Sequence, residues 1–406
     1  MRVLLFAGKG GVGKTTLAAG TAGALAVSGR KTLVVSTDPA HSLADALDVA
    51  VGADPTEVDA GLSACQVDIR ALVDGAWEQL RGHLGTVLAG AGVDDVLAEE
   101  LTVLPGLEEL LALAEVARMA RRGIWDVVVV DCAPTADSLR LLALPEAVST
   151  YLERLFPTHR RLVRGLLAGL AGDGSSAQRW DEAADAIGRL AERLESLRAL
   201  LTDPQVTGVR LVLTPERVVA AETRRTVTAL TLQGIRVDGL IANRLVPAPA
   251  VSARGTAAGW LRTRRREQDA VLAALCSDLP DLPVTTVEHH AAEPVGLPAL
   301  LGLAGSLGEG AAMLGDARPG VPLLAVEHVG GSGLDSEYVL RLAVSLLDET
   351  DPELARVGDE IAVTSAGHRR LITLPSVLRR CVVTGAEVDG AGLLVRFRPD
   401  PALWMR

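Results

Sequence analysis

Aromatic residues are scarce in this 406-residue sequence: Trp, Tyr and Phe together make up 2% of it. Sites that hold nucleic-acid bases or sugars often use aromatic rings for stacking, so the scarcity disfavours both kinds of site. Basic residues number 40 against 51 acidic ones, a formal net charge of -11. Proteins that bind nucleic acid by neutralising phosphates need the opposite balance, so we expect no nucleic-acid partner.

Cysteine is also rare, and the four cysteines lie far apart without a CxxC pair. This spacing excludes a disulfide framework and a zinc ribbon and fits a reducing compartment, so we predict a cytoplasmic protein. No charge-free apolar stretch of about 20 residues occurs, which predicts no transmembrane segment. The N-terminal apolar run passes straight into GKGG, so we interpret it as a buried strand and not as a signal peptide.

Short continuous apolar runs alternate with helical patterns over residues 1–305. This alternation predicts an α/β fold: a mostly parallel, doubly wound sheet with an inserted helical subdomain. The helical insertions are expected at about residues 62–122 and 141–203. The expected strands are Arg2–Ala7, Lys31–Thr37, Trp125–Asp131, Val209–Thr214 and Val237–Ala242.

The composition changes after residue 305. Residues 306–320 are rich in Gly, Ala, Asp and Pro, which is typical of a linker. Short runs with turn signals between them follow over residues 321–400 and predict a small all-β sandwich. We therefore expect a large N-terminal domain, a linker and a small C-terminal domain.

Residues 8–15 read GKGGVGKT and fit the phosphate-loop pattern G-x-x-x-x-G-K-[ST] between a strand and a helix. In such a loop Lys14 reaches the β/γ-phosphates of ATP, the Thr15 hydroxyl holds Mg²⁺, and Thr16 can reach the α-phosphate. The sequence thus predicts a P-loop NTPase. The residues expected to bind ATP are Gly8, Lys9, Gly10, Gly11, Val12, Gly13, Lys14, Thr15 and Thr16.

Lys9 is a second lysine in this loop, directly after its first glycine. This is the deviant form of the motif. Its functional interpretation is a charge that reaches across a dimer interface to the partner's nucleotide, as an arginine finger does. The alternative is a solvated loop lysine. Since the chain has one phosphate loop, the functional interpretation requires a homodimer.

Two aspartates follow predicted strands of the sheet. Asp38 comes after the second strand, at the edge where ligands of parallel sheets bind, and could orient the attacking water; the alternative is a helix cap. Asp131 ends the run WDVVVVD, the Walker B form, and is expected to hold Mg²⁺ through water. The alternative for Asp131 is a turn aspartate at a strand end.

Three segments, KGGVGKTT, STDPAHSLADAL and DCAPTADSLRLLALP, together resemble the ArsA-type ATPases. That family includes the arsenite-pump ATPase and the ATPase that delivers tail-anchored membrane proteins. The resemblance covers about residues 1–305. It implies that Asp38 is a catalytic carboxylate alongside Lys14, that Lys9 is the intersubunit lysine, and that Glu216 and Asn243 contact the nucleotide.

The sequence departs from parts of that family. The stretch ARGTAAGW has no cysteine where the eukaryotic targeting ATPases carry a zinc-binding CxxC, so no zinc is expected. The segment after the linker resembles a small heat-shock, α-crystallin-like domain. Apolar residues between Leu152 and Leu170 form a dense stripe, which either packs in the core or lines a groove for a client helix.

We therefore expect a Mg²⁺-dependent ATPase that works as a nucleotide-switched homodimer. Its partner would be a hydrophobic client segment or a membrane protein, with the ATPase cytoplasmic or peripheral at the membrane. The rival interpretations are a positioning ATPase of the MinD/ParA type and an arsenite-efflux pump subunit. A kinase or ligase and a chaperone module with incidental hydrolysis are further alternatives.

Overall fold

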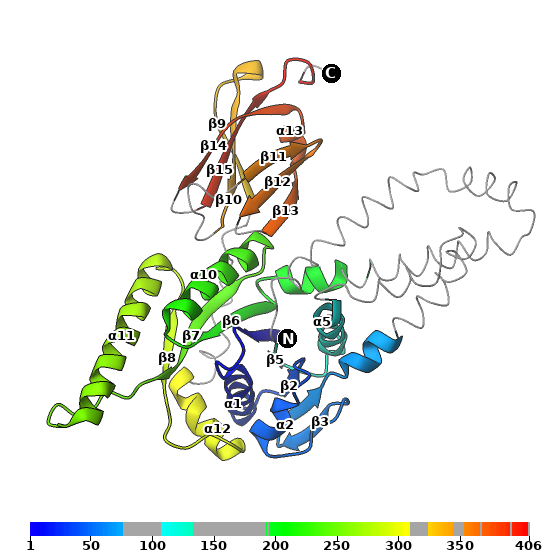
Figure 1. Cartoon of the computed structure of the whole chain (residues 1–406). Coiled ribbons are helices and arrows are strands. Elements are labelled where there is room, and N and C mark those ends of the chain that lie inside the picture. The colour runs from blue at the N-terminus through cyan, green and yellow to red at the C-terminus, as the bar shows by residue number, and fades with distance from the viewer. Residues whose placement is uncertain are drawn as a thin grey trace, which may run out of the picture.

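The computed structural model describes residues 1–75, 107–132, 192, 195–308, 324–344, 353–365, 368–389 and 392–404. The described part of the first 308 residues consists of strands and helices, most of them in alternation (Figure 1). In chain order they are β1 Arg2–Ala7, α1 Lys14–Val27, β2 Thr32–Ser36, α2 Ser42–Leu47, β3 Thr56–Asp59, β4 Leu62–Gln66, α5 Leu107–Ala120, β5 Val127–Asp131, β6 Thr207–Leu213, α10 Arg217–Leu232, β7 Val237–Leu245, α11 Thr256–Asp278, β8 Val284–Glu288 and α12 Leu297–Ala304.

Eight of these strands form one sheet in the order β3-β4-β2-β5-β1-β6-β7-β8. β3 runs antiparallel to β4, and the other neighbouring pairs among the described strands are parallel. The five strands expected from continuous apolar runs all lie in this sheet, because such runs are typical of strands covered on both faces. The predicted α/β fold is confirmed.

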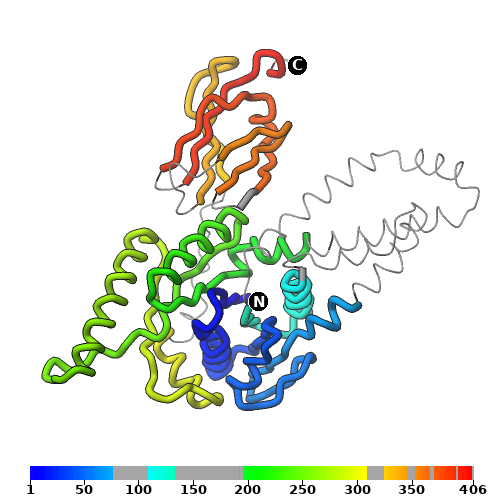
Figure 2. The backbone as a smooth tube through the Cα atoms, viewed as in Figure 1, coloured from blue at the N-terminus to red at the C-terminus, as the bar shows by residue number. Residues whose placement is uncertain are grey.

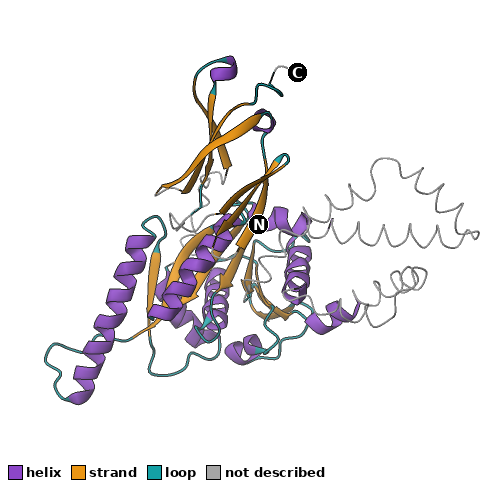
Figure 3. Ribbon diagram, turned by 45° about the horizontal axis from the view of Figure 1, so that its top comes forward, coloured by secondary structure: helices purple, strands orange, loops and turns teal. Residues whose placement is uncertain are grey.

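Helices cover both faces of the large sheet (Figure 3). α1 joins β1 to β2 in one direction across the sheet, and α10 joins β6 to β7 in the other. Because parallel crossovers are right-handed, these two helices lie on opposite faces. α12 packs closely on α1, since a Cβ at Gly20 would lie 2.8 Å from the main-chain oxygen of Leu300.

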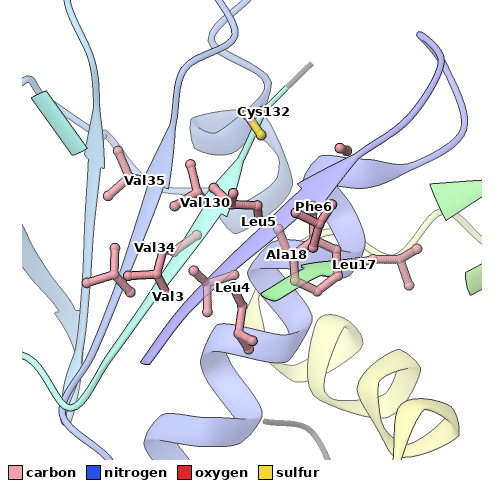
Figure 4. Close-up of a cluster of buried hydrophobic side chains, with 14 of the residues drawn as sticks. Val3, Leu4, Leu5, Phe6, Leu17, Ala18, Val34, Val35, Val130 and Cys132 are labelled. Carbon is pink, nitrogen blue, oxygen red and sulfur yellow. The ribbon is translucent and has the colours of Figure 1, made fainter. Parts of the chain in front are cut away.

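The core of this domain lies between the sheet and its helices. Figure 4 shows Leu4 and Phe6 of β1 gathered with Leu17 of α1, and all three side chains are fully buried. With so few aromatics, aliphatic side chains fill most of this layer. Burial of this apolar surface fixes the end of β1, and with it the loop that leads into α1.

The carboxyl ends of the parallel strands meet at one edge of the sheet. Asp131 of β5 is in register with Phe6 of β1 on one side and with Ser36 of β2 on the other, and Gln66 of β4 is in register with Ser36. The crossovers change direction between β1 and β6. Ligands of open parallel sheets bind at this kind of edge, where the crossover direction changes.

One sequence-based expectation is wrong here. Leu62–Gln66 lie at the start of a stretch interpreted as helical, but they form β4. Ser63 and Gln66 interrupt the apolar run, yet all five residues are buried because β4 pairs with β2 inside the sheet. α5 is helical, as expected. Residues 76–106 and most of 141–203, including the apolar stripe, lie outside the described residues.

The C-terminal part is built from two antiparallel sheets, β14-β15-β10-β9 and β11-β12-β13. Side chains from both sheets share one apolar core, which confirms the predicted all-β sandwich. β11, with the sequence ELARV, is a strand that the sequence analysis missed. The strands are β9 Leu324–Gly330, β10 Glu337–Leu342, β11 Glu353–Val357, β12 Glu360–Ser365, β13 His368–Thr373, β14 Cys381–Asp389 and β15 Gly392–Pro399.

The sandwich packs against the C-terminal end of α10 (Figure 2). Leu232, the last residue of α10, is buried in the apolar core of the sandwich. The Arg370 guanidinium of β13 also donates a hydrogen bond to the main-chain oxygen of Leu232. No helix in the described part of the chain is both long enough and apolar enough to cross a bilayer.

Candidate nucleotide-binding site

The loop between β1 and α1 has a glycine-dependent backbone. Gly8, Gly11 and Gly13 have φ angles of 142°, 79° and 93°, which side-chain-bearing residues rarely adopt. A Cβ at Gly8 would also overlap with the main-chain oxygen of Val212 in β6. The loop leads directly into α1, and the N–H groups and dipole at a helix N-terminus favour a bound anion.

The two lysines of the loop point to different partners. Lys14, 7% exposed, donates from Nζ to the main-chain oxygen of Lys9 at 3.1 Å. The Lys9 ammonium instead pairs with the Glu222 carboxylate of α10 at 3.2 Å. One ammonium group therefore folds back over the loop, whereas the other is held by a helix of the same chain.

Thr15 and Asp131 meet at the centre of the sheet edge. The Thr15 hydroxyl donates to Asp131 Oδ2 at 2.7 Å and lies 3.1 Å from Ser42 Oγ. The Ser36 hydroxyl also donates to Asp131 Oδ2, at 3.1 Å. Asp131 is 1% exposed, and no described residue donates a hydrogen bond to its buried Oδ1. A free carboxylate oxygen thus lies beside the Thr15 hydroxyl.

The environment of Asp131 suits a cation. Burial raises the pKa of its carboxyl group, although hydrogen bonds from Thr15 and Ser36 and the charge of Lys14 oppose the rise. The charged carboxylate is therefore costly in the fold, and a divalent cation would offset that cost. Mg²⁺ prefers hard oxygen ligands and is commonly held by one or two protein groups with phosphate and water, so Thr15 and Asp131 fit it.

Asp38 lies in the loop after β2, and its main chain is held on both sides. Its N–H donates to Ser36 Oγ at 3.2 Å, and its carbonyl accepts from Gln66 Nε2 at 2.6 Å. Its Oδ1 accepts a hydrogen bond from the Ala40 N–H at 3.0 Å. This last contact is a local turn and not the helix cap of the alternative interpretation, because the N-cap residue of α2 is His41. It leaves Oδ2 of the half-buried side chain for another donor.

Asn243 of β7 lies against the phosphate loop. Its Nδ2 donates to the main-chain oxygen of Val12 at 2.8 Å, and a Cβ at Gly13 would overlap with that amide group. Its Oδ1 accepts from the Arg244 N–H at 2.9 Å. The amide therefore braces the loop in this structure, next to the position where the sequence resemblance expects the nucleotide.

Glu216 precedes the first residue of α10, and its carboxylate pairs with Arg264 of α11 at 2.7 Å. Arg264 belongs to the run RTRRR, whose other described contacts include ion pairs of Arg265 with Asp269 and Glu288. Of the two predicted nucleotide contacts, Glu216 thus lies in the connection after β6, and Asn243 lies in the neighbouring strand β7. Each already has a protein partner.

Comparison with known proteins agrees with this geometry. The anion-transporting ATPase family, ArsA-type, matches residues 1–309. The chain belongs to this family. A second match covers residues 335–397 and is the HSP20-like domain found in ArsA proteins. The resemblance stated from the three sequence segments and from the C-terminal pattern is therefore confirmed.

Three relatives illustrate the range of the ArsA-type family. Protein Rv2184c of Mycobacterium tuberculosis is 43% identical over 99% of this chain and 97% of its own length. A Chlorobaculum tepidum protein named "Putative arsenical pump-driving ATPase" is 32% identical over 96% of this chain and 93% of its own length. The ATPase ASNA1 homolog of Trypanosoma cruzi is 30% identical over 72% of this chain and 87% of its own length.

Several contacts in this ArsA-type ATPase were missed by sequence reasoning. They involve Ser36, Gln66, Glu222 and Arg264. The signal for Ser36 was its position as a polar residue at the end of an apolar strand, two residues before Asp38. Gln66 was hidden because β4 was interpreted as helix, and the pairing of Glu222 and Arg264 with distant residues leaves no local pattern.

The cysteines of the ArsA-type ATPase do not form a cluster. All four are free, and Cys65, Cys132 and Cys381 are buried. Burial raises the pKa of the Cys132 thiol to about 12, so this residue beside Asp131 is a packed, unreactive group. Within the described ranges, no three or more His, Cys, Asp and Glu residues come together as a metal site.

Proposed function

We propose that the protein is a Mg²⁺-dependent ATPase that hydrolyses ATP to ADP and phosphate and switches between open and closed homodimers. The observation that carries the proposal is the buried contact between Thr15 and Asp131 beside Lys14 and the glycine loop. This arrangement supplies main-chain donors and one ammonium group for phosphates, and oxygen ligands for a cation.

Each group has a definite part in the proposed reaction. Lys14 and the N-terminus of α1 bind the β- and γ-phosphates, and Thr15 and Asp131 hold Mg²⁺, which supplies charge neutralisation on the phosphate oxygens. Asp38 orients a water molecule toward the γ-phosphorus. The bond from phosphorus to that water oxygen forms as the bond to the bridging oxygen of ADP breaks, and positioning and charge stabilisation lower the barrier.

The proposed dimer follows from Lys9. Its side chain is 46% exposed, and its ammonium is held in this structure by Glu222 of its own chain. An exposed pair of this kind contributes about 0.2–1 kcal/mol, so approach of a second subunit with ATP can displace it at little cost. In the closed dimer Lys9 adds positive charge to the triphosphate of the partner subunit.

Glu216 and Asn243 are proposed to contact the nucleoside end of ATP. Asn243 contacts the phosphate loop, and Glu216 lies between β6 and α10, next to the strand β1 that leads into that loop. The client of the switch is proposed to be a hydrophobic segment or a membrane protein. That part of the proposal depends on the apolar stripe Leu152–Leu170, which lies outside the described residues.

The proposal is tested by phosphate release and by sedimentation. Turnover should require Mg²⁺ and fall to background in Asp38→Asn, while the protein should sediment as a dimer with ATP and Mg²⁺. A protein that stays monomeric under these conditions, and that turns over normally after Lys9→Ala, would contradict the dimer. Unchanged turnover in Asp38→Asn would remove Asp38 from catalysis and leave nucleotide binding intact.

An arsenite-dependent pump subunit is the alternative that the name of the Chlorobaculum tepidum relative raises. Arsenite behaves as a soft Lewis acid, and its preferred protein ligands are cysteine thiolates. The four free cysteines do not pair, and three are buried. We therefore expect no arsenite stimulation of turnover. A several-fold stimulation that disappears on cysteine substitution would favour the alternative.

A positioning ATPase of the MinD/ParA type is a further alternative. Pelleting of the protein with liposomes or with DNA would favour it.

A further inference from the structure

Gln66 is a buried amide that touches the loop of Asp38. It is the last residue of β4, is 5% exposed, and lies in register with Ser36 of β2. Its Nε2 donates to the main-chain oxygen of Asp38 at 2.6 Å across 28 positions of sequence. The contact therefore ties the loop that follows β2 to the neighbouring strand of the sheet.

Gln66 and Ser36 hold the same residue from two sides. Ser36 Oγ accepts the Asp38 N–H at 3.2 Å, and its own hydroxyl proton is donated to Asp131 Oδ2 at 3.1 Å. Gln66 fixes the carbonyl at the other end of Asp38. A continuous set of contacts thus runs from Thr15 through Asp131 and Ser36 to Asp38 and ends at Gln66.

Stability alone does not favour glutamine at this position. The Oε1 atom of Gln66 is buried, and no described residue donates a hydrogen bond to it. A buried polar atom without a partner costs free energy, which an apolar side chain of similar length avoids. What the glutamine amide provides, and an apolar side chain would not, is the hydrogen bond from Nε2 to the main-chain oxygen of Asp38.

We propose that Gln66 is a positioning residue for ATP hydrolysis, which sets the direction of the Asp38 carboxylate by fixing the Asp38 carbonyl. The proposal rests on the proposed role of Asp38. Without the amide donor, the peptide after Asp38 rotates more freely, and the carboxylate loses its alignment with the attacking water. Misplacement of a reacting group by about 1 Å can cost roughly 100-fold in rate.

The test uses the full-length protein and two variants of similar side-chain length. Gln66→Met removes both the donor and the unpartnered acceptor, and Gln66→Glu keeps oxygen atoms but removes the donor. We expect kcat to fall roughly 10- to 100-fold in both, with KM and the affinity for a fluorescent ATP analogue unchanged. The melting temperature of Gln66→Met should equal or exceed that of the parent protein.

Gln233→Met is the matched control, because Gln233 is also buried, at 4% exposure, but follows the far end of α10. It should leave kcat unchanged. Two results would overturn the proposal: unchanged kcat in Gln66→Met, or a fall in kcat that only matches a loss of folded protein. The Asp38→Asn variant distinguishes failure of this proposal from failure of the proposed function. Full turnover in Asp38→Asn would contradict the role of Asp38. Lost turnover in Asp38→Asn together with normal turnover in Gln66→Met would contradict only the role of Gln66.

A double variant gives one more readout. Asp38→Glu keeps a carboxylate on the loop and therefore a measurable turnover. If Gln66 acts through Asp38, adding Gln66→Met to Asp38→Glu should lower kcat by a smaller factor than Gln66→Met lowers it in the parent protein. Additive losses, equal to the product of the two single effects, would mean that Gln66 acts independently of Asp38 and would overturn the proposal.

Discussion

The buried half of the candidate site is held by hydrogen bonds, whereas the exposed half is held by ion pairs. The buried half consists of the buried residues Lys14, Ser36, Gln66 and Asp131 with the half-buried Thr15. In the exposed half, Lys9 pairs with Glu222 and Arg264 with Glu216, and these four side chains are between 33% and 49% exposed. Buried hydrogen bonds are costly to leave unmade, but exposed ion pairs exchange easily.

The two halves of the site therefore differ in how easily their contacts can be exchanged. In the proposed function, the buried half supplies preorganised groups for phosphate and cation, which would stabilise charge in the transition state. The exposed half can change partners when nucleotide or a second subunit arrives, because little free energy is lost. The proposed switch needs both properties in one site, and the two acidic residues of the exposed half are Glu222 of α10 and Glu216 at its N-terminal end.

The largest effect should follow from Asp131→Asn in the buried half. Removing the carboxylate charge should lower kcat/KM roughly 100- to 1,000-fold, the range seen when one group that stabilises the transition state is lost. The Mg²⁺ concentration needed for half-maximal turnover should rise as well. Phosphate release across a Mg²⁺ titration measures both effects.

For Asp131→Asn we also predict an effect on the stability of the fold. The pKa of Asp131 in the fold lies above its ordinary value of 3.8, so the folded state binds this proton more tightly than the unfolded state does. Its contribution to stability is full at acid pH and is lost as pH rises through the folded pKa. In Mg²⁺-free urea unfolding at neutral pH, Asp131→Asn should therefore be at least as stable as the parent protein.

The next effect concerns the backbone beneath the buried half. Gly8→Ala should destabilise the nucleotide-free protein by about 2 kcal/mol, because φ at this position is 142° and the new Cβ would meet Val212. Gly10→Ala is the control from the same loop, since a Cβ there would have no atom within 4 Å. Thermal unfolding without nucleotide compares the two, and equal losses would contradict the strain argument.

The contrast between the halves also explains what the sequence could predict. Lys14 and Thr15 belong to a local strand-loop-helix pattern, and Asp131 ends an apolar run, so short-range signals were sufficient. Gln66 meets Asp38 only through the register of β2 and β4. β4 itself was misassigned, because its polar residues make a strand buried on both faces look discontinuous.

In the sandwich domain, too, strands with a local apolar pattern were predicted, whereas a strand without such a pattern was missed. Six of its strands were visible as short apolar runs, but β11 was missed. Its sequence ELARV lies at the edge of a three-stranded sheet and is mostly exposed, so the alternation that marks a half-buried strand is weak. The contact of Leu232 with this domain also joins distant segments, which no local pattern predicts.

A smaller effect is expected in the exposed half from Glu222→Gln. Release of Lys9 should lower the ATP concentration needed for dimer formation by up to about fivefold, since an exposed ion pair contributes at most about 1 kcal/mol. Sedimentation at several ATP concentrations measures the shift. Glu387→Gln breaks an exposed pair with Arg396 in the C-terminal sandwich and should change nothing. A loss of dimer in Glu222→Gln would mean that Glu222 supports the active position of Lys9.

The smallest effect should come from Arg264→Gln, which frees Glu216, the proposed nucleoside contact. KM for ATP should change less than about threefold, because the pair is exposed and screened.

The salt dependence of these variants is more informative than the size of the change in KM. The screening length falls from about 10 Å at 0.1 M salt to about 3 Å at 1 M, so the effects of Arg264→Gln and Glu222→Gln should fade together. The losses in Asp131→Asn and Gln66→Met should persist at high salt, since neither depends on a solvent-exposed ion pair. If all four variants responded equally to salt, the division into a buried, fixed half and an exposed, exchangeable half would be wrong.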